Sequence, residues 1–301
     1  MLPTSRSIAA ALVAALALGA PAAATATSAP DRAPGAAARA DAPEAGTLDE
    51  LMRVTRLGEQ SRDAAASMAR TLVEGARESD RPAPPGTAVA VRRAAELAFS
   101  PDRVEGLVAA RLAGELSAED ARRVAERAAA PLWQRALDGE DAHDLDEDPE
   151  GFARFASSFG AGPEDAERIA ATAALLEAAG GAELMGAIAI DTRKAMVHGA
   201  ALADPSAGPA RTEAALAAIE ARRGAIVERM GRLMPVVLAW SYQGLSTKEL
   251  RALVVEARRP EWRRFNAVAA EAVRDAMVLG SLEFADRAAR AAQTLSKTSR
   301  I

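Results

Sequence analysis

Cysteine is absent from this chain of 301 residues, and histidine occurs only twice. The missing cysteine excludes disulfides, thiolate nucleophiles and cysteine-ligated metals. Aromatic side chains are also scarce, with three tryptophans, one tyrosine and six phenylalanines. A sugar-cleaving site normally needs aromatic platforms and a carboxyl group with a raised pKa, and this composition makes such a site hard to assemble.

Neither sign of charge dominates the chain. The 37 basic and 42 acidic residues are interspersed and give a formal net charge of −5. This balance predicts no nucleic-acid partner, because a surface that binds nucleic acid normally contains a basic patch or stripe. Beyond the N-terminal segment no apolar run is long enough to cross a bilayer, so we expect no stable membrane insertion of the mature chain.

Alanine and leucine account for most of the apolar residues, and strand-forming residues are few. Alanine has the highest helix propensity, and leucine, arginine and glutamate follow it closely. No sustained alternation of apolar and polar residues marks a strand. The sequence therefore predicts an all-α fold, in which tandem antiparallel helical units form a bundle or a short helical array.

The first 24 residues have the three parts of a secretory signal peptide. Arg6 precedes an apolar run over residues 8–18, and an A-x-A cleavage site follows. The run is too short to be a membrane span. We expect residues 1–24 to be a signal peptide, residues 25–46 to be a flexible leader rich in alanine and proline, and the mature protein to be periplasmic or secreted. A capping box at Thr47–Glu50 predicts the first ordered helix.

Part of the chain is repeated at an offset of 129 residues. Leu116 and Ser117 recur as Leu245 and Ser246, and the segment 131–135 recurs as 260–264. A shared register across polar, aromatic and helix-breaking residues indicates one supersecondary unit used twice. The structural anchors of the two units are Ser117, Pro131, Trp133, Ser246, Glu249, Pro260 and Trp262.

These patterns divide the chain beyond the leader into three parts. Helical repeat 1 covers residues 47–138, and helical repeat 2 covers 164–301. Residues 139–163 between them form an acidic loop and a helix bearing phenylalanines. The spacing of Phe152, Phe155 and Phe159 puts them on one helical face. We expect this face to join the two repeats; the alternative is an exposed groove for a partner helix or lipid. Ser281 is expected to cap a terminal helix.

The segment Tyr242–Leu250 resembles the family called domain of unknown function 2059, small helical domains of exported bacterial proteins. It has an aromatic residue, a Leu-Ser-x-x-Glu-Leu box and, ten residues on, Pro260. Residues 175–185 are similar to the leading helix of that family. The resemblance covers about 168–280, and more weakly about 47–138, which implies two tandem copies. It implies no activity and no catalytic residue.

The acidic loop is the best candidate for metal chemistry. Asp144, Asp146 and Asp148 have the alternate spacing of a calcium loop, and hard cations favour such oxygens. Pro149 and Phe155 occupy the places where a calcium loop needs glycine and glutamate. We favour a solvated acidic linker, because runs of charge are usually exposed.

The remaining candidates are also read mainly as structural. Trp133 and Trp262 could form a ligand platform, but an aromatic shortly after a helix-starting proline more often anchors that helix to the core. Arg135 and Arg264 could form ion pairs that hold the turn or could bind an anion, and we favour the ion pairs. Neither His143 nor His198 has a nucleophile and an orienting partner nearby in the sequence.

The sequence contains no nucleophile–base set, metal cluster or phosphate loop, and we expect no cofactor. The hypothesis is an exported, non-enzymatic protein that binds or scaffolds an unidentified envelope protein or ligand. The alternative is a helical cell-wall hydrolase with a lone glutamate acid. For that enzyme, a pocket between the repeats lined by Glu249 or Glu256 would be expected.

Overall fold

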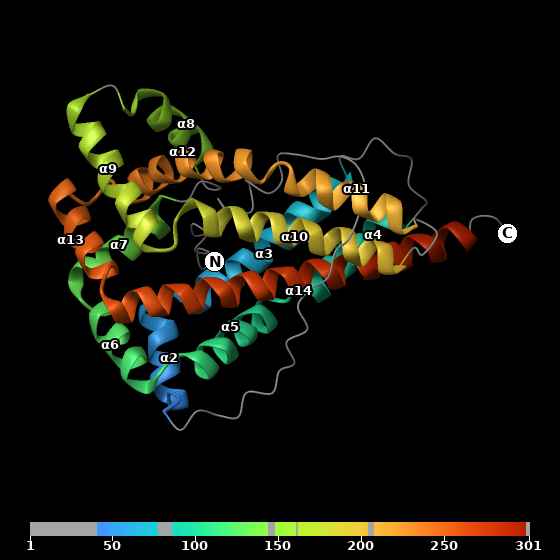
Figure 1. Cartoon of the computed structure of the whole chain (residues 1–301), viewed down its shortest axis with the longest axis horizontal. Coiled ribbons are helices and arrows are strands. Elements are labelled where there is room, and N and C mark those ends of the chain that lie inside the picture. The colour runs from blue at the N-terminus through green and yellow to red at the C-terminus, as the bar shows by residue number, and fades with distance from the viewer. Residues whose placement is uncertain (1–40, 78–85, 144–147, 161, 204–207, 299–301) are drawn as a thin grey trace.

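The computed structural model describes residues 41–77, 86–143, 148–160, 162–203 and 208–298 (Figure 1). These residues form helices and contain no strand, which confirms the all-α prediction. The predicted signal peptide and most of the predicted leader, residues 1–40, lie outside the described residues.

Helices follow one another in the same order in both halves of the chain. The first half contains α2 (Ala45–Val54), α3 (Leu57–Arg77), α4 (Thr87–Ala98), α5 (Pro101–Glu115), α6 (Ala118–Ala128) and α7 (Pro131–Ala142). After α8 (Pro149–Ser158), the second half contains α9 (Pro163–Ala178), α10 (Gly181–Ala203), α11 (Pro209–Glu220), α12 (Arg223–Ser241), α13 (Thr247–Ala257) and α14 (Pro260–Thr298). α2 packs on α6 as α9 packs on α13, and α3 packs on α4 as α10 packs on α11.

Local sequence signals start the helices of the repeated segment. Pro131 and Pro260 are the first residues of α7 and α14, where a missing N–H costs nothing. Ser117 caps α6 by accepting a hydrogen bond from the Asp120 N–H at 3.0 Å. Ser246 caps α13 in the same way, accepting from the Glu249 N–H at 3.3 Å.

The first ordered helix begins earlier than predicted. α2 starts at Ala45, its N-cap is Glu44, and no side chain caps it. The predicted capping box does not form, because Thr47 lies inside the helix and is not its N-cap. Glu50 accepts hydrogen bonds from the Arg53 guanidinium at 2.6 and 2.8 Å.

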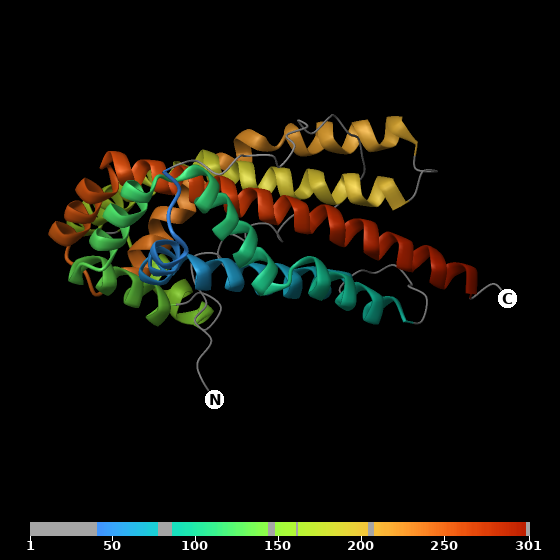
Figure 2. The same ribbon diagram turned by 90° about the horizontal axis from the view of Figure 1, so that it is seen from below.

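The last helix is much longer than predicted. α14 is continuous from Pro260 to Thr298 and runs along most of the molecule (Figures 1 and 2). Ser281 does not cap a new helix, because it is fully buried in the middle of α14. α14 makes its most extensive contact with α10. A Cβ at Gly199 would lie 2.2 Å from the Leu282 carbonyl oxygen, so only glycine permits this close crossing.

The last helix of each half also packs against the other half. α14 supplies buried residues from Trp262 to Met277 to the core built by α2–α6. In the other direction, α7 supplies Ala136 to the core built by α9, α12 and α13. Trp133 packs against both cores. Each half therefore completes the hydrophobic core of the other, and the contact between them contains α7 and the start of α14.

Candidate functional site

The repeated tryptophans stack on each other where the two halves meet. Trp133 on α7 and Trp262 on α14 have ring centroids 4.6 Å apart and an interplanar angle of 23°. Phe265 meets Trp262 edge-on at 5.6 Å. Trp262 is only 4% exposed. The sequence predicted that each indole anchors its own helix, and the structure also joins them into one pair.

Ion pairs around the stacked rings connect equivalent positions reciprocally. Arg135 of the first half pairs with Glu249 of the second at 2.5 Å. The equivalent residues, Arg264 and Asp120, pair in the opposite sense at 3.7 Å. Such reciprocity, in which i contacts j and j contacts i, is the mark of a two-fold interface. The two halves therefore meet around a local approximate two-fold axis.

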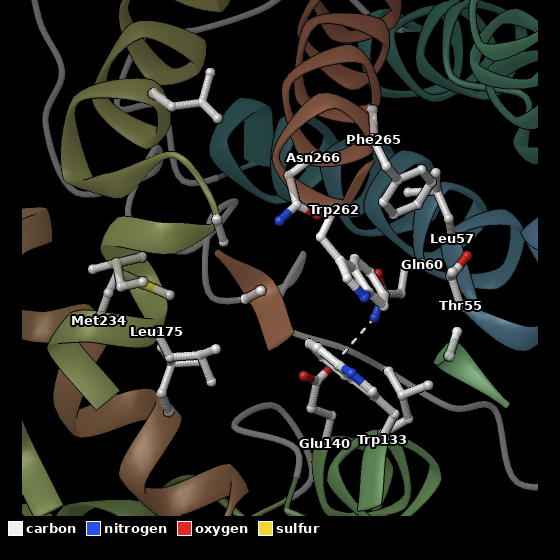
Figure 3. A pocket seen from close by; sticks show the side chains of 18 of the residues that line it. Thr55, Leu57, Gln60, Trp133, Glu140, Leu175, Met234, Trp262, Phe265 and Asn266 are labelled. Carbon is white, nitrogen blue, oxygen red and sulfur yellow. Dashed lines mark hydrogen bonds between the residues drawn. The ribbon is translucent and has the colours of Figure 1, made fainter. Parts of the chain in front are cut away.

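A cavity of about 290 Å³ lies in this contact region, a size near the lower end of small-molecule sites (Figure 3). Both halves line it, and many lining residues occupy equivalent positions. The matched pairs are Ala128 with Ala257, Trp133 with Trp262, Leu137 with Asn266, and Glu140 with Ala269. The α2–α3 turn and the α9–α10 turn supply further walls. Apart from a few polar groups the lining is apolar.

Glu140 is the one charged side chain among the described residues that line the cavity. It lies in α7, is 7% exposed, and accepts a hydrogen bond from the Tyr242 hydroxyl at Oε1. Gln60 on α3 donates to Oε2 at 3.1 Å (Figure 3). Burial raises the pKa of Glu140 to about 7, although the Tyr242 hydrogen bond opposes that rise. Burial also raises the pKa of Tyr242 well above its ordinary value.

Close packing of α7 on the end of α12 places Glu140 beside Tyr242. A Cβ at Gly139 would lie 2.6 Å from the Ser241 carbonyl oxygen, so the helices approach closely only because this position is glycine. Arg56 in the α2–α3 turn pairs with both Asp138 and Asp141 on α7. These contacts hold the last turns of α7 from two sides.

The position of Glu140 corrects the sequence prediction. We expected it to belong to a solvated acidic loop, but α7 continues to Ala142 and turns this carboxyl inward. A signal was present: Trp133, Leu137 and Glu140 are spaced i, i+4 and i+7, which puts them on one helical face. The surrounding acidic residues and Gly139 concealed it.

Only one of the three candidate metal ligands, Asp148, lies in the described part of the chain. Asp144 and Asp146 lie outside the described residues. Asp148 is the N-cap of α8 and accepts a hydrogen bond from the Gly151 N–H at 2.8 Å. Among the described residues no three histidine, aspartate or glutamate side chains form a group that could hold a metal ion.

Neither glutamate expected for a hydrolase lines the cavity. Glu249 accepts hydrogen bonds from Arg135 and from the Ser246 cap, and these lower its pKa to about 2. Glu256 accepts hydrogen bonds from Arg259 and Arg127. These contacts, chiefly the one with Arg259, lower the pKa of Glu256. Carboxyl groups held ionised in this way are poor general acids.

The phenylalanine-bearing helix covers the third tryptophan. Phe155 stacks on Phe159 at 4.6 Å and lies 5.4 Å from Trp240 of α12. Phe152 meets Trp240 edge-on at 6.0 Å. His143 caps the end of α7 and meets Trp240 from another side. The stripe, which we expected to join the two repeats, therefore packs on α12 of the second half.

No protein family, no curated protein and no solved structure matches this chain. In the described residues no single helix has the length and apolar character of a membrane span, while α9 and α10, bent by 58°, meet that test as a pair.

Proposed function

We propose that this chain is an exported, non-enzymatic binding protein that holds a small, mostly apolar molecule in the cavity between its two halves. One observation carries the proposal: an apolar cavity, lined by described residues of both halves, contains a single buried carboxyl group, that of Glu140. Apolar pockets with a few placed polar groups are typical of small-molecule sites. Export is supported by the signal-like residues 1–24 and by the resemblance of residues 168–280 to exported helical domains.

Filling the cavity tests this proposal. Leu184 lines the cavity on α10, whereas Leu202 lies on the same helix, 61% exposed and outside the lining. Calorimetry would measure binding of six-carbon alcohols, amines and acids to the wild type, to Leu184→Trp and to Leu202→Trp. We expect at least one compound to bind the wild type and Leu202→Trp, and to lose its binding to Leu184→Trp. Equal affinity for all three proteins, or no binding to any, would refute the proposal.

The second candidate is the cell-wall hydrolase with a lone acid, and one observation favours it. A buried carboxyl with a pKa of about 7 is suited to general acid catalysis. The size and apolar lining of the cavity favour binding instead, because a polysaccharide needs an open and polar groove. Purified peptidoglycan incubated with the wild type and with Glu140→Gln separates the two: fragments released by the wild type alone would favour the enzyme.

A further inference from the structure

The charges around the cavity are unbalanced. Among the described residues, its lining contains one carboxyl group and no arginine, lysine or histidine. The nearby cation, Arg56, is already paired with Asp138 and Asp141. An anionic ligand would therefore enter a poorly solvated site whose described walls hold a carboxyl and no cationic side chain, which is electrostatically unfavourable.

We infer that the preferred ligand carries one positive charge, as a primary amine with a small apolar body does, and that its ammonium group pairs with the Glu140 carboxylate. This inference rests on the proposed binding function. A cation offsets the cost of burying the carboxylate, because each ion replaces part of the solvation that the other lost. A neutral ligand of the same shape gains nothing from this pairing.

The rest of the lining suits such a molecule. Trp133, Tyr242, Trp262 and Phe265 all line the cavity, and the faces of aromatic rings attract cations. Leucine, methionine and alanine side chains from both halves complete the walls and provide apolar contact for the body of the ligand. The aromatic rings thus suit the amine of the ligand, and the aliphatic side chains of the same cavity suit its apolar body.

Protonation of Glu140 sets the pH at which an amine binds. Its pKa of about 7 means that below this pH the carboxyl group is mostly protonated and must lose its proton before it can pair with an ammonium group. Tyr242 and Gln60 face the carboxyl with hydrogen bonds, Asp141 raises its pKa, and Arg56 lowers it. Amine binding should therefore release a proton at low pH, and affinity should fall about tenfold per pH unit below about 7.

Three probes of one shape test the inference. Hexylamine, hexanol and hexanoate share an apolar chain and are cationic, neutral and anionic. At about pH 8, calorimetry should show hexylamine binding the wild type about 10- to 100-fold more tightly than hexanol, the range of a charged hydrogen bond. Hexanol or hexanoate binding at least as tightly as hexylamine would overturn the inference alone. If none of the three compounds binds, both the proposed binding function and this inference fail.

Two variants separate charge from shape. Glu140→Gln should lose the preference for hexylamine and keep its affinity for hexanol within about twofold, which also reports an intact cavity. Tyr242→Phe keeps the carboxyl but removes a hydrogen bond that lowers its pKa. In this variant the pH midpoint of hexylamine binding should rise. A preference retained by Glu140→Gln, or an unchanged midpoint in Tyr242→Phe, would overturn the role of Glu140.

Discussion

Arg127 and Glu256 occupy equivalent positions in the two halves of the chain, 129 residues apart, and they pair with each other at 2.9 Å. A residue pairs with its own equivalent only close to a two-fold axis. The stacked indoles of Trp133 and Trp262 obey the same rule. The cavity lies beside these contacts, so the candidate binding site is formed where the two duplicated halves meet.

A double-mutant cycle tests the Arg127–Glu256 pair. Both side chains are partly exposed, so we expect a coupling free energy of about 0.5 to 1 kcal/mol from urea unfolding of Arg127→Ala, Glu256→Ala and the double variant. Arg122 is the matched control, because its guanidinium pairs with Glu119 on its own helix. Arg122→Ala and Glu256→Ala should be additive. Additivity of the Arg127 and Glu256 variants would contradict the reciprocal contact.

The stacked indoles should be visible by circular dichroism. Two indoles with centroids 4.6 Å apart couple their electronic transitions, which gives a paired positive and negative band. Trp133→Phe and Trp262→Phe should each abolish this band pair. Trp240→Phe is the control, because this ring contacts Phe152, Phe155 and His143 instead. Loss of the bands in Trp240→Phe would contradict the stacking.

Gly139 should tolerate no side chain. In Gly139→Ala the new methyl group would collide with the Ser241 backbone carbonyl, and we expect the free energy of unfolding to fall by about 1 to 3 kcal/mol. Gly106→Ala is the matched control, since Gly106 lies inside α5 and, apart from the adjoining backbone of α5 itself, a methyl group added there would meet no described atom within 4 Å. That variant should gain about 0.5 to 1 kcal/mol from helix propensity. Equal effects in chemical denaturation would argue against the close approach of α7 and α12.

Stability should fall as pH rises through the range between the unfolded and folded pKa values of Glu140. Its folded pKa is raised from 4.5 to about 7, so the folded state holds the proton more tightly than the unfolded state. The resulting loss in the free energy of unfolding is absent below about pH 4.5 and complete above about pH 7, where it reaches about 3 kcal/mol. Urea unfolding at about pH 5 and pH 8 should show this loss in the wild type relative to Glu140→Gln. Parallel pH profiles for the two proteins would mean that the carboxyl is solvated.

The features that were predicted from sequence are local ones. Pro131 and Pro260 start helices, and Ser117 and Ser246 cap them, because each signal acts on backbone groups within one turn. Ser281 carried a similar signal, yet the helix continues through it. Burial of α14 along α10 outweighs a single capping residue.

The site itself depends on contacts between distant segments. Glu140 is turned inward because α7 packs on α12, and its hydrogen-bond partners come from positions 60 and 242. A run of acidic residues gives no hint of this arrangement. The packing of α7 and α14 against the opposite half is equally non-local, although the 129-residue register indicated which residues are equivalent.

The most direct test is a pH titration of the Glu140 carboxyl carbon by NMR, with the resonance assigned by its loss in Glu140→Gln. A carboxyl buried in the cavity should titrate with a midpoint near 7, and saturating hexylamine should move that midpoint downward. A midpoint near 4.5 that hexylamine leaves unchanged would contradict both the buried site and its ligand.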